Sequence, residues 1–176
     1  MIKYSEVLEK MAEDQRIVDL TKRTREKGWR PTSDDMDILK DMADTYGLEN
    51  KEIYGNKALA PYINGMGGDR DNWPKVLADW WMPGSTVAAG IHDIDYKAGG
   101  TDADRDQADS RFLRNLNRIA AKDFAYSDKN SAYRNFINWI KTTFLPKMGY
   151  YSVRVGGKGH FNYGGRPIAN LETANA

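Results

Sequence analysis

His92 and Asp93 are the residues of this chain whose types and neighbours best suit acid–base chemistry. His92 is one of only two histidines among 176 residues, and histidine is the side chain that most readily gains and loses a proton near neutral pH. Tyr96 follows His92 by four residues, so both lie on one face of a helix, whereas Asp93 points about 100° away. One helix can therefore direct a base and a candidate metal ligand into the same cleft.

A second helix must bring a partner to His92. Gly99 and Gly100 predict a short turn, after which the chain runs back antiparallel and Asp109 can come opposite His92. A carboxylate on the far ring nitrogen would fix the tautomer of His92 and stabilise its imidazolium while the other nitrogen removes a proton. Tyr96 could hold that carboxylate by a hydrogen bond. No matching Ser or Cys nucleophile accompanies these residues, so the expected nucleophile is water.

The same stretch also has a plainer interpretation. His92 with Asp93 could be a charged turn or helix surface. Asp102, Asp104 and Asp106, which follow the glycine turn, are interpreted as helix-capping or solvated residues and not as metal ligands.

The composition is that of a soluble globular protein with one sizeable domain. Apolar residues make up 40% of the chain and charged residues 29%. The 26 Lys and Arg nearly balance the 25 Asp and Glu, so net charge favours neither nucleic acid nor an anionic membrane, although local patches could. The absence of cysteine excludes disulfides and thiolate metal sites. The first residues do not resemble a signal peptide, and no apolar run is long enough to span a membrane.

Apolar periodicity and capping residues predict a mainly α architecture. The expected helices run from Ser5 to about Lys27, from a cap at Thr32 or Ser33 to Gly47, from a cap at Ser85 or Thr86 to Gly99, from a cap at Thr101 through Ile119, and from about Ser131 to Leu145 before Pro146. Residues 150–155 alternate briefly like a strand, and a glycine-rich segment follows. The apolar side chains of Trp80, Trp81, Met82, Phe136, Trp139, Ile140 and Phe144 are expected in the core. Trp80, Trp81 and Met82 could instead form a lipid-facing rim, since Trp favours membrane interfaces.

The quoted residues support a resemblance to a known family. The segment HDIDY, residues 92–96, followed by ADSRF, residues 108–112, resembles the paired helix motifs of the phospholipase A2 superfamily, especially its cysteine-poor bacterial, fungal and viral-capsid members. The matching residues are His92, Asp93, Tyr96, Asp109 and Phe112. The cysteine usual before the tyrosine in animal members is Asp95 here. The resemblance covers roughly residues 62–120 and implies a pair of antiparallel helices. It does not account for the N-terminal helical hairpin or the C-terminal tail.

The family resemblance also implies roles and a metal. His92 would be the general base acting on water, Asp109 its partner, and Asp93 a ligand of calcium. The segment NGMGGD, residues 64–69, is similar to the family's glycine-rich calcium loop at Gly65, Gly67 and Gly68, although these glycines fit a plain turn equally well. Calcium takes 6 to 8 oxygen ligands, carbonyls included.

These observations lead to two functional expectations. The first is calcium-dependent hydrolysis of a glycerophospholipid acyl ester, with a phospholipid membrane surface as the substrate. The second is a structural or assembly protein of a virus or phage particle, with protein partners, built on the same helices. The expected division is a helical hairpin and linker in residues 1–61, a phospholipase A2-like domain in residues 62–150 and a glycine-rich tail in residues 151–176. The chain is expected to be soluble and cytoplasmic when made, or associated with a particle.

Overall fold

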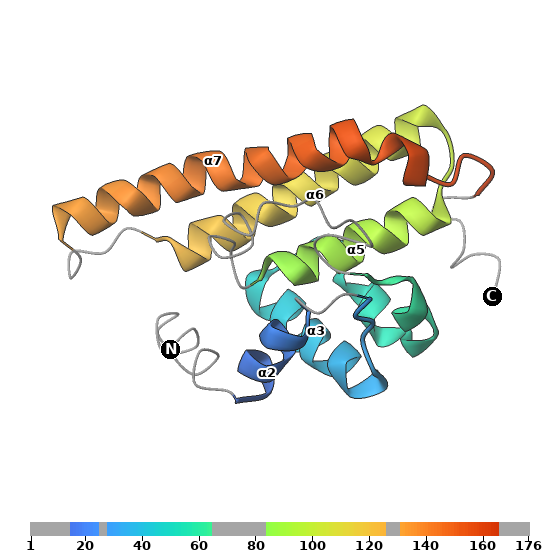
Figure 1. The fold of residues 1–176 in the computed structure, drawn as a ribbon, viewed down its shortest axis with the longest axis horizontal. Coiled ribbons are helices and arrows are strands. Elements are labelled where there is room, and N and C mark those ends of the chain that lie inside the picture. The colour runs from blue at the N-terminus through green and yellow to red at the C-terminus, as the bar shows by residue number, and fades with distance from the viewer. Residues whose placement is uncertain (1–14, 25–27, 65–83, 126–130, 166–176) are drawn as a thin grey trace.

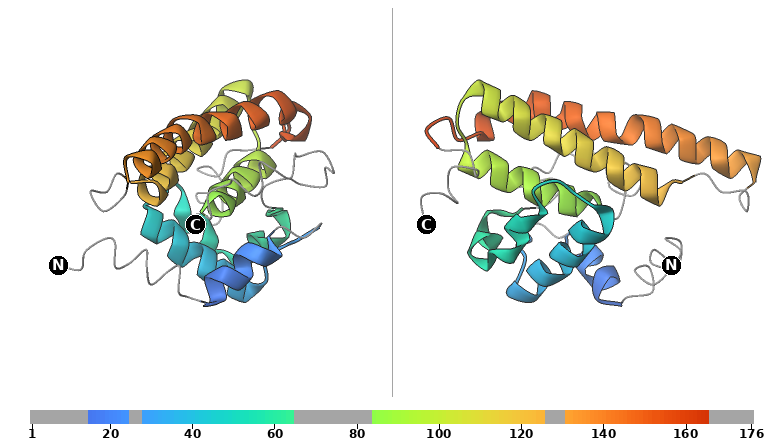
Figure 2. Two further views of the ribbon diagram at one scale, coloured as in Figure 1. Left: turned by 60° about the vertical axis from the view of Figure 1, so that its left-hand side comes forward. Right: turned by 180° about the vertical axis from the view of Figure 1, so that it is seen from behind.

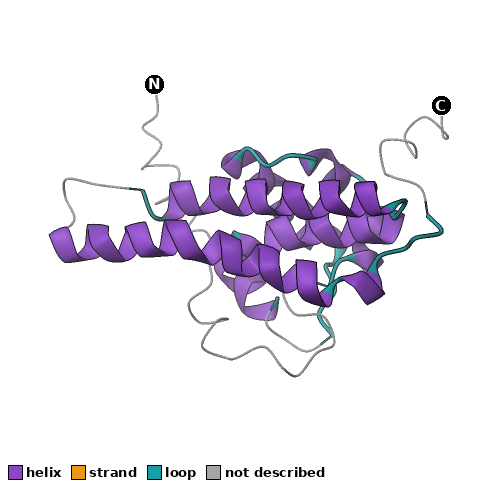
Figure 3. Ribbon diagram, turned by 90° about the horizontal axis from the view of Figure 1, so that it is seen from above, coloured by secondary structure: helices purple, strands orange, loops and turns teal. Residues whose placement is uncertain are grey.

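The computed structural model describes residues 15–24, 28–64, 84–125 and 131–165, and its regular elements are helices (Figures 1 and 3). No residue within these ranges lies in a β-strand, which confirms the mainly α class. In chain order the elements are α2 (Gln15–Arg23), α3 (Ser33–Tyr46), the 3-10 helices η1 (Lys51–Gly55) and η2 (Lys57–Tyr62), α5 (Ser85–Ala98), α6 (Asp102–Asp123), α7 (Ala132–Gly156) and the 3-10 helix η3 (Lys158–His160).

Capping residues set the starts of α3 and α6. The backbone N–H of Thr32 donates to Asp35 Oδ2 at 2.9 Å, and the N–H of Asp35 donates to the Thr32 hydroxyl at 3.2 Å. Thr101 and Asp104 form the same reciprocal pair at the start of α6. Each pair satisfies N–H groups that a helix start leaves without an intrahelical partner. Both predicted caps are confirmed, whereas α5 begins at Ser85 after Gly84, without a side-chain cap.

The helices form two groups around α5. α6 packs against α5 and α7, and α3 lies with η1 and η2 on the other side of α5 (Figures 1 and 2). One hydrophobic cluster joins the two groups and includes Leu39 of α3, Ile91 of α5, Leu116 of α6 and Leu145 of α7. Residues on both sides of the expected boundary at 61 and 62 therefore share one core.

The course of α7 corrects the sequence prediction. We expected the helix to end before Pro146 and residues 150–155 to be extended, but α7 continues to Gly156 with Pro146 inside it. Proline removes one backbone donor from a helix. Leu145, Pro146 and Gly149 are buried, so packing on both sides of the proline maintains the helix.

The exposure of α7 side chains is a second correction. Phe136, Trp139 and Phe144 were expected in the core, but they are 55%, 60% and 53% exposed, while Ile140 is partly buried. Helical spacing predicts which residues share a face and not whether another element covers that face. Trp80, Trp81 and Met82 lie outside the described residues. Among the helices that are described, none combines the length and apolar character that crossing a bilayer requires.

Candidate active site

The turn between α5 and α6 brings His92 and Asp109 together. Gly99 and Gly100 have φ angles of 78° and 132°, which glycine adopts without the strain that other residues would suffer. A Cβ atom at Gly99 would also collide with the backbone carbonyl of Asn162, which packs against this turn. The reversed chain places Asp109 Oδ1 3.0 Å from His92 Nε2. The predicted contact is present, and both side chains are buried.

Asp109 accepts hydrogen bonds at both of its carboxylate oxygens. Tyr96 donates its hydroxyl to Oδ1 at 2.6 Å, and Arg154 of α7 donates to Oδ2 at 2.9 Å. Burial by itself would raise the pKa of the Asp109 carboxyl, but the hydrogen bonds from His92, Tyr96 and Arg154 outweigh it and hold that pKa below its usual value. Asp109 is therefore a buried carboxylate that stays charged.

Arg105 and Arg154 connect this carboxylate to the last turns of α7. Arg105 donates to the backbone carbonyl of Arg154 at 2.7 Å, and its Nε lies 3.4 Å from the Tyr96 hydroxyl. Arg154 also forms an ion pair with Asp106. Hydrogen bonds to Asp109 and Asp106 raise the pKa of the Arg154 guanidinium, which is thus a fixed positive charge. The sequence reasoning missed both arginines and treated Asp106 as solvated.

Aromatic rings hold the imidazole of His92 in place. Its ring centroid lies 4.0 Å from that of Tyr96 and 4.8 Å from that of Phe112, so both rings are in contact with it. Phe161, beyond α7, meets Tyr96 edge to face at 5.2 Å. Burial and the neighbouring Asp109 raise the pKa of the Tyr96 hydroxyl, so it remains a proton donor to the carboxylate. With Nε2 directed at Asp109, Nδ1 is the ring nitrogen left to accept a proton.

Asp93 points to a different neighbour from His92, as the helical geometry predicted. It is partly buried, and its Oδ2 accepts a hydrogen bond of 2.8 Å from the backbone N–H of Asn64. Asn64 is the residue directly before Gly65, so Asp93 lies where the glycine segment begins. Gly65, Gly67 and Gly68 themselves lie outside the described residues.

Other metal-binding groups are not found in the described part of the chain. No three His, Asp or Glu side chains come together there in an arrangement that could hold an ion. An ion at Asp93 would therefore take its further ligands from backbone carbonyls, from water or from residues outside the described ranges.

Tyr54 fixes the part of α5 that carries these residues. Its buried hydroxyl donates to the backbone carbonyl of Val87, and a Cβ at Gly90 would collide with it. Gly90 thus lets η1 approach α5 closely, two residues before His92 and three before Asp93. Burial, together with the charge of Asp93, raises the pKa of the Tyr54 hydroxyl. Tyr54 therefore stays neutral and acts as a support of the helix.

Asp95 braces α5 and α6 without a covalent bond. Its Oδ2 accepts a 2.7 Å charge-assisted hydrogen bond from Arg111 of α6, and its Oδ1 accepts one of 3.1 Å from Asn50. Asp95 is buried, and burial outweighs these contacts and raises the pKa of its carboxyl.

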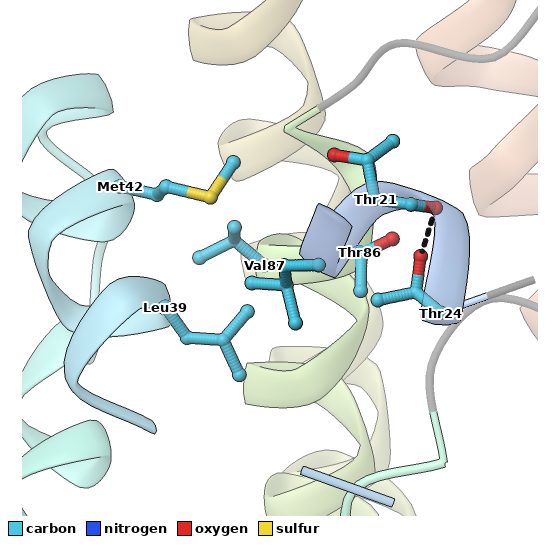
Figure 4. A pocket seen from close by; sticks show the side chains of 7 residues that line it. Thr21, Thr24, Leu39, Met42, Thr86 and Val87 are labelled. Atoms are coloured by element: carbon cyan, nitrogen blue, oxygen red, sulfur yellow. Dashed lines mark hydrogen bonds between the residues drawn. The ribbon is translucent and has the colours of Figure 1, made fainter. Parts of the chain in front are cut away.

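A small pocket elsewhere offers no chemistry of this kind (Figure 4). It lies between α2, α3 and the start of α5, and Thr24 donates its hydroxyl to the backbone carbonyl of Thr21 at 2.9 Å within it. Its lining consists of Leu20, Thr21, Thr24, Leu39, Met42, Thr86 and Val87. No ionisable side chain lines the pocket, so the His92 group is the stronger candidate.

Comparison with protein-family models, with curated proteins and with solved structures finds no match to this chain.

Proposed function

We propose that this protein is a phospholipase of the phospholipase A2 type, which hydrolyses an acyl ester of a glycerophospholipid with calcium as its cofactor. The observation that carries the proposal is the contact of His92 Nε2 with a buried, charged Asp109 on the facing helix. Tyr96 adds a second hydrogen bond to the same carboxylate oxygen. A base, its orienting carboxylate and a support for that carboxylate are thus present in one place.

The proposed reaction assigns one role to each of these groups. His92 Nδ1 removes a proton from water, and the resulting hydroxide adds to the carbonyl carbon of the ester. The charge of Asp109 stabilises the imidazolium that forms at His92. When the C–O bond of the ester breaks, the proton on Nδ1 passes to the leaving alkoxide, which gives a fatty acid and a lysophospholipid. Tyr96 and Arg154 keep Asp109 oriented and charged throughout.

Asp93 would hold the calcium ion together with backbone carbonyls of Gly65, Gly67 and Gly68. When bound, calcium supplies positive charge that stabilises the oxyanion of the ester. The hydrogen bond from Asn64 supports this assignment because it positions Asp93 at the start of the glycine segment.

Release of fatty acid from phospholipid vesicles tests the proposed hydrolysis. We expect release with calcium, little with magnesium and none with a chelator. His92→Gln should lower the rate at least about a thousandfold, within the range general base catalysis contributes. His160→Gln is the matched control because His160 is the only other histidine and is exposed in η3. Equal rates for the two variants would contradict the role of His92. Absence of hydrolysis by the wild type under all these conditions would favour the assembly role.

Thermal melting tests the metal role without relying on activity. At about 100-fold excess over the dissociation constant, a bound ion stabilises the folded state by roughly 2.7 kcal/mol, a shift of several degrees. We expect that shift for calcium in the wild type and in Asp41→Asn, whose exposed carboxylate lies on α3. Asp93→Asn should lose it. If millimolar calcium does not shift the melting temperature of the wild type more than magnesium does, the metal-binding role of Asp93 is contradicted.

A further inference from the structure

Helix α7 is apolar on two sides, and only one of them is buried. Leu145, Pro146 and Gly149 lie on the buried side. The other side presents Val155 at 84% exposure and Tyr133 at 74%. A helix with apolar residues on both sides normally has a partner on both. We define the α7 face as the exposed residues Tyr133, Phe136, Phe144, Tyr151 and Val155.

The residues of the α7 face lie on one side of the helix. Steps of 3, 8, 7 and 4 residues separate Tyr133, Phe136, Phe144, Tyr151 and Val155, so at 100° per residue all five return to one side. Trp139, which is also exposed, borders this face and stacks on Phe136 with ring centroids 6.1 Å apart. α7 lies along one edge of the described molecule, beside α6 (Figure 1). Exposed apolar side chains gathered along one side of a helix in this way are typical of a binding surface.

The charges of α7 have one sign. The helix contains Arg134, Lys141, Lys147 and Arg154 and no Asp or Glu. Arg154 pairs with Asp106 and Asp109, but Arg134 and Lys147 are exposed. Two copies meeting through this face would bring like charges together, which disfavours a second copy as the partner.

We propose that the α7 face binds the surface of an anionic phospholipid membrane. Trp and Tyr prefer the interface between headgroups and acyl chains, and basic residues are attracted to anionic lipids. The 25 residues of α7 span roughly 37 Å at about 1.5 Å per residue, so the helix can lie along the interface with its aromatic side inserted. This binding is separate from the proposed hydrolysis and does not depend on the reactivity of His92.

Sedimentation of the full chain with vesicles tests this inference. One set of vesicles contains phosphatidylcholine alone, and the other contains phosphatidylglycerol as well. The double variant Phe136→Ser and Phe144→Ser removes two rings of the α7 face, and Tyr62→Ser is its control because Tyr62 is 45% exposed on η2. All changes are at exposed positions, so the melting temperatures should stay near that of the wild type.

We expect the wild type to bind anionic vesicles more tightly than neutral ones. The double phenylalanine variant should bind anionic vesicles at least tenfold more weakly, and Tyr62→Ser should bind as the wild type does. Arg134→Gln with Lys147→Gln should lower affinity for anionic vesicles about 25-fold, since each basic residue near the surface contributes about fivefold. Affinity for neutral vesicles should not change with these two substitutions.

Two outcomes overturn the inference. The first is that the wild type does not bind anionic vesicles, or that the phenylalanine variant binds them equally well. The second is a wild-type dimer in light scattering that the same variant dissociates, which would show that a second copy covers the face. His92→Gln should still bind vesicles. Hydrolysis of a soluble short-chain phospholipid without vesicle binding would refute only the α7 surface, and vesicle binding without hydrolysis would refute only the proposed function.

Discussion

Asp109 and Asp123 are two carboxyl groups on the same helix, and their surroundings shift their pKa values in opposite directions. Asp109 is fully buried and accepts hydrogen bonds from His92, Tyr96 and Arg154, which keep its pKa low. Burial raises the pKa of Asp123 to about 6, because only one hydrogen bond, donated by the Tyr46 hydroxyl at 2.8 Å, acts to lower it. Within the described part of the chain, Asp123 Oδ2 is buried without a hydrogen-bond partner. The number of donors, and not burial alone, decides whether a buried carboxylate stays charged.

Asp109→Asn should have the largest effect of any change to this pair. It leaves Arg154 and Arg105 facing a neutral amide, and loss of one partner of a buried ion pair costs about 3 kcal/mol or more in free energy of unfolding. Since the pKa of Asp109 is lowered by folding, its contribution is present above about pH 4 and is lost as the pH falls further. Denaturant unfolding of variant and wild type at pH 7 and pH 3 measures this, and the difference should shrink at pH 3.

The same variant should lower phospholipid hydrolysis at least about a hundredfold, because the imidazole of His92 loses its charged partner. A variant with full activity and unchanged stability would show that Asp109 is an ordinary helix residue. The contrast between the two carboxylates would then have no functional meaning.

Asp123→Asn should act in the opposite direction and stabilise the protein. Folding raises the pKa of this carboxyl from 3.8 to about 6, so the native state is favoured when Asp123 is protonated, and this contribution is lost as the pH rises through about 6. At pH 7.5 the variant should gain up to about 3 kcal/mol in free energy of unfolding, at roughly 1.4 kcal/mol for each pKa unit. At pH 4 the gain should nearly vanish, and activity should not change. Destabilisation at pH 7.5 would mean that the charged form has a partner.

Arg154→Met removes one donor from Asp109 and leaves the other donors in place. Hydrogen bonds to charged groups contribute about 1.5–3 kcal/mol, and Arg154 is about one-third exposed, so we expect a loss near the lower value at pH 7. Arg134→Met is the matched control on the same helix, because Arg134 is exposed and its loss should change stability by less than about 0.5 kcal/mol. Equal melting temperatures for the two variants would exclude Arg154 as a support of the carboxylate.

Tyr46→Phe should have the smallest effect. It removes the hydrogen bond that Asp123 accepts, which contributes about 1 kcal/mol. The loss should be greater at pH 7.5 than at pH 4, because the bond is stronger when the carboxylate is charged. Unfolding measurements at the two pH values would detect this difference, and a loss independent of pH would indicate altered packing of the ring instead.

The sequence predicted those parts of the fold and site that depend on local spacing. Thr101 was predicted as a cap, Thr32 was one of two predicted alternatives with Ser33, and the glycine turn with helical periodicity predicted that Asp109 faces His92. Arg105, four residues before Asp109 on the same helix, could have been found by the same periodicity. The resemblance to phospholipases remains a prediction, as does the role of Asp93.

Contacts between residues far apart in the sequence could not be predicted from local spacing. Arg154 is 45 residues from Asp109 in the sequence, and only the packing of α7 on α6 brings them together. Pro146 wrongly predicted a helix end because tertiary packing outweighed the missing donor. Phe136 and Phe144 have helical spacing, but a spacing pattern contains no information on which face another element covers.

The distance in sequence between Asp109 and Arg154 has a consequence for the order in which a growing chain acquires its parts. His92 and Asp109 are separated by 17 residues and can pair once α5 and α6 have left the ribosome, since domains begin to fold from the N-terminal side during synthesis. Arg154, and Asn162 against the glycine turn, are added only later. A nascent chain therefore contains His92 and Asp109 before it contains the arginine that fixes the Asp109 carboxylate, and translation of α7 supplies that last contact.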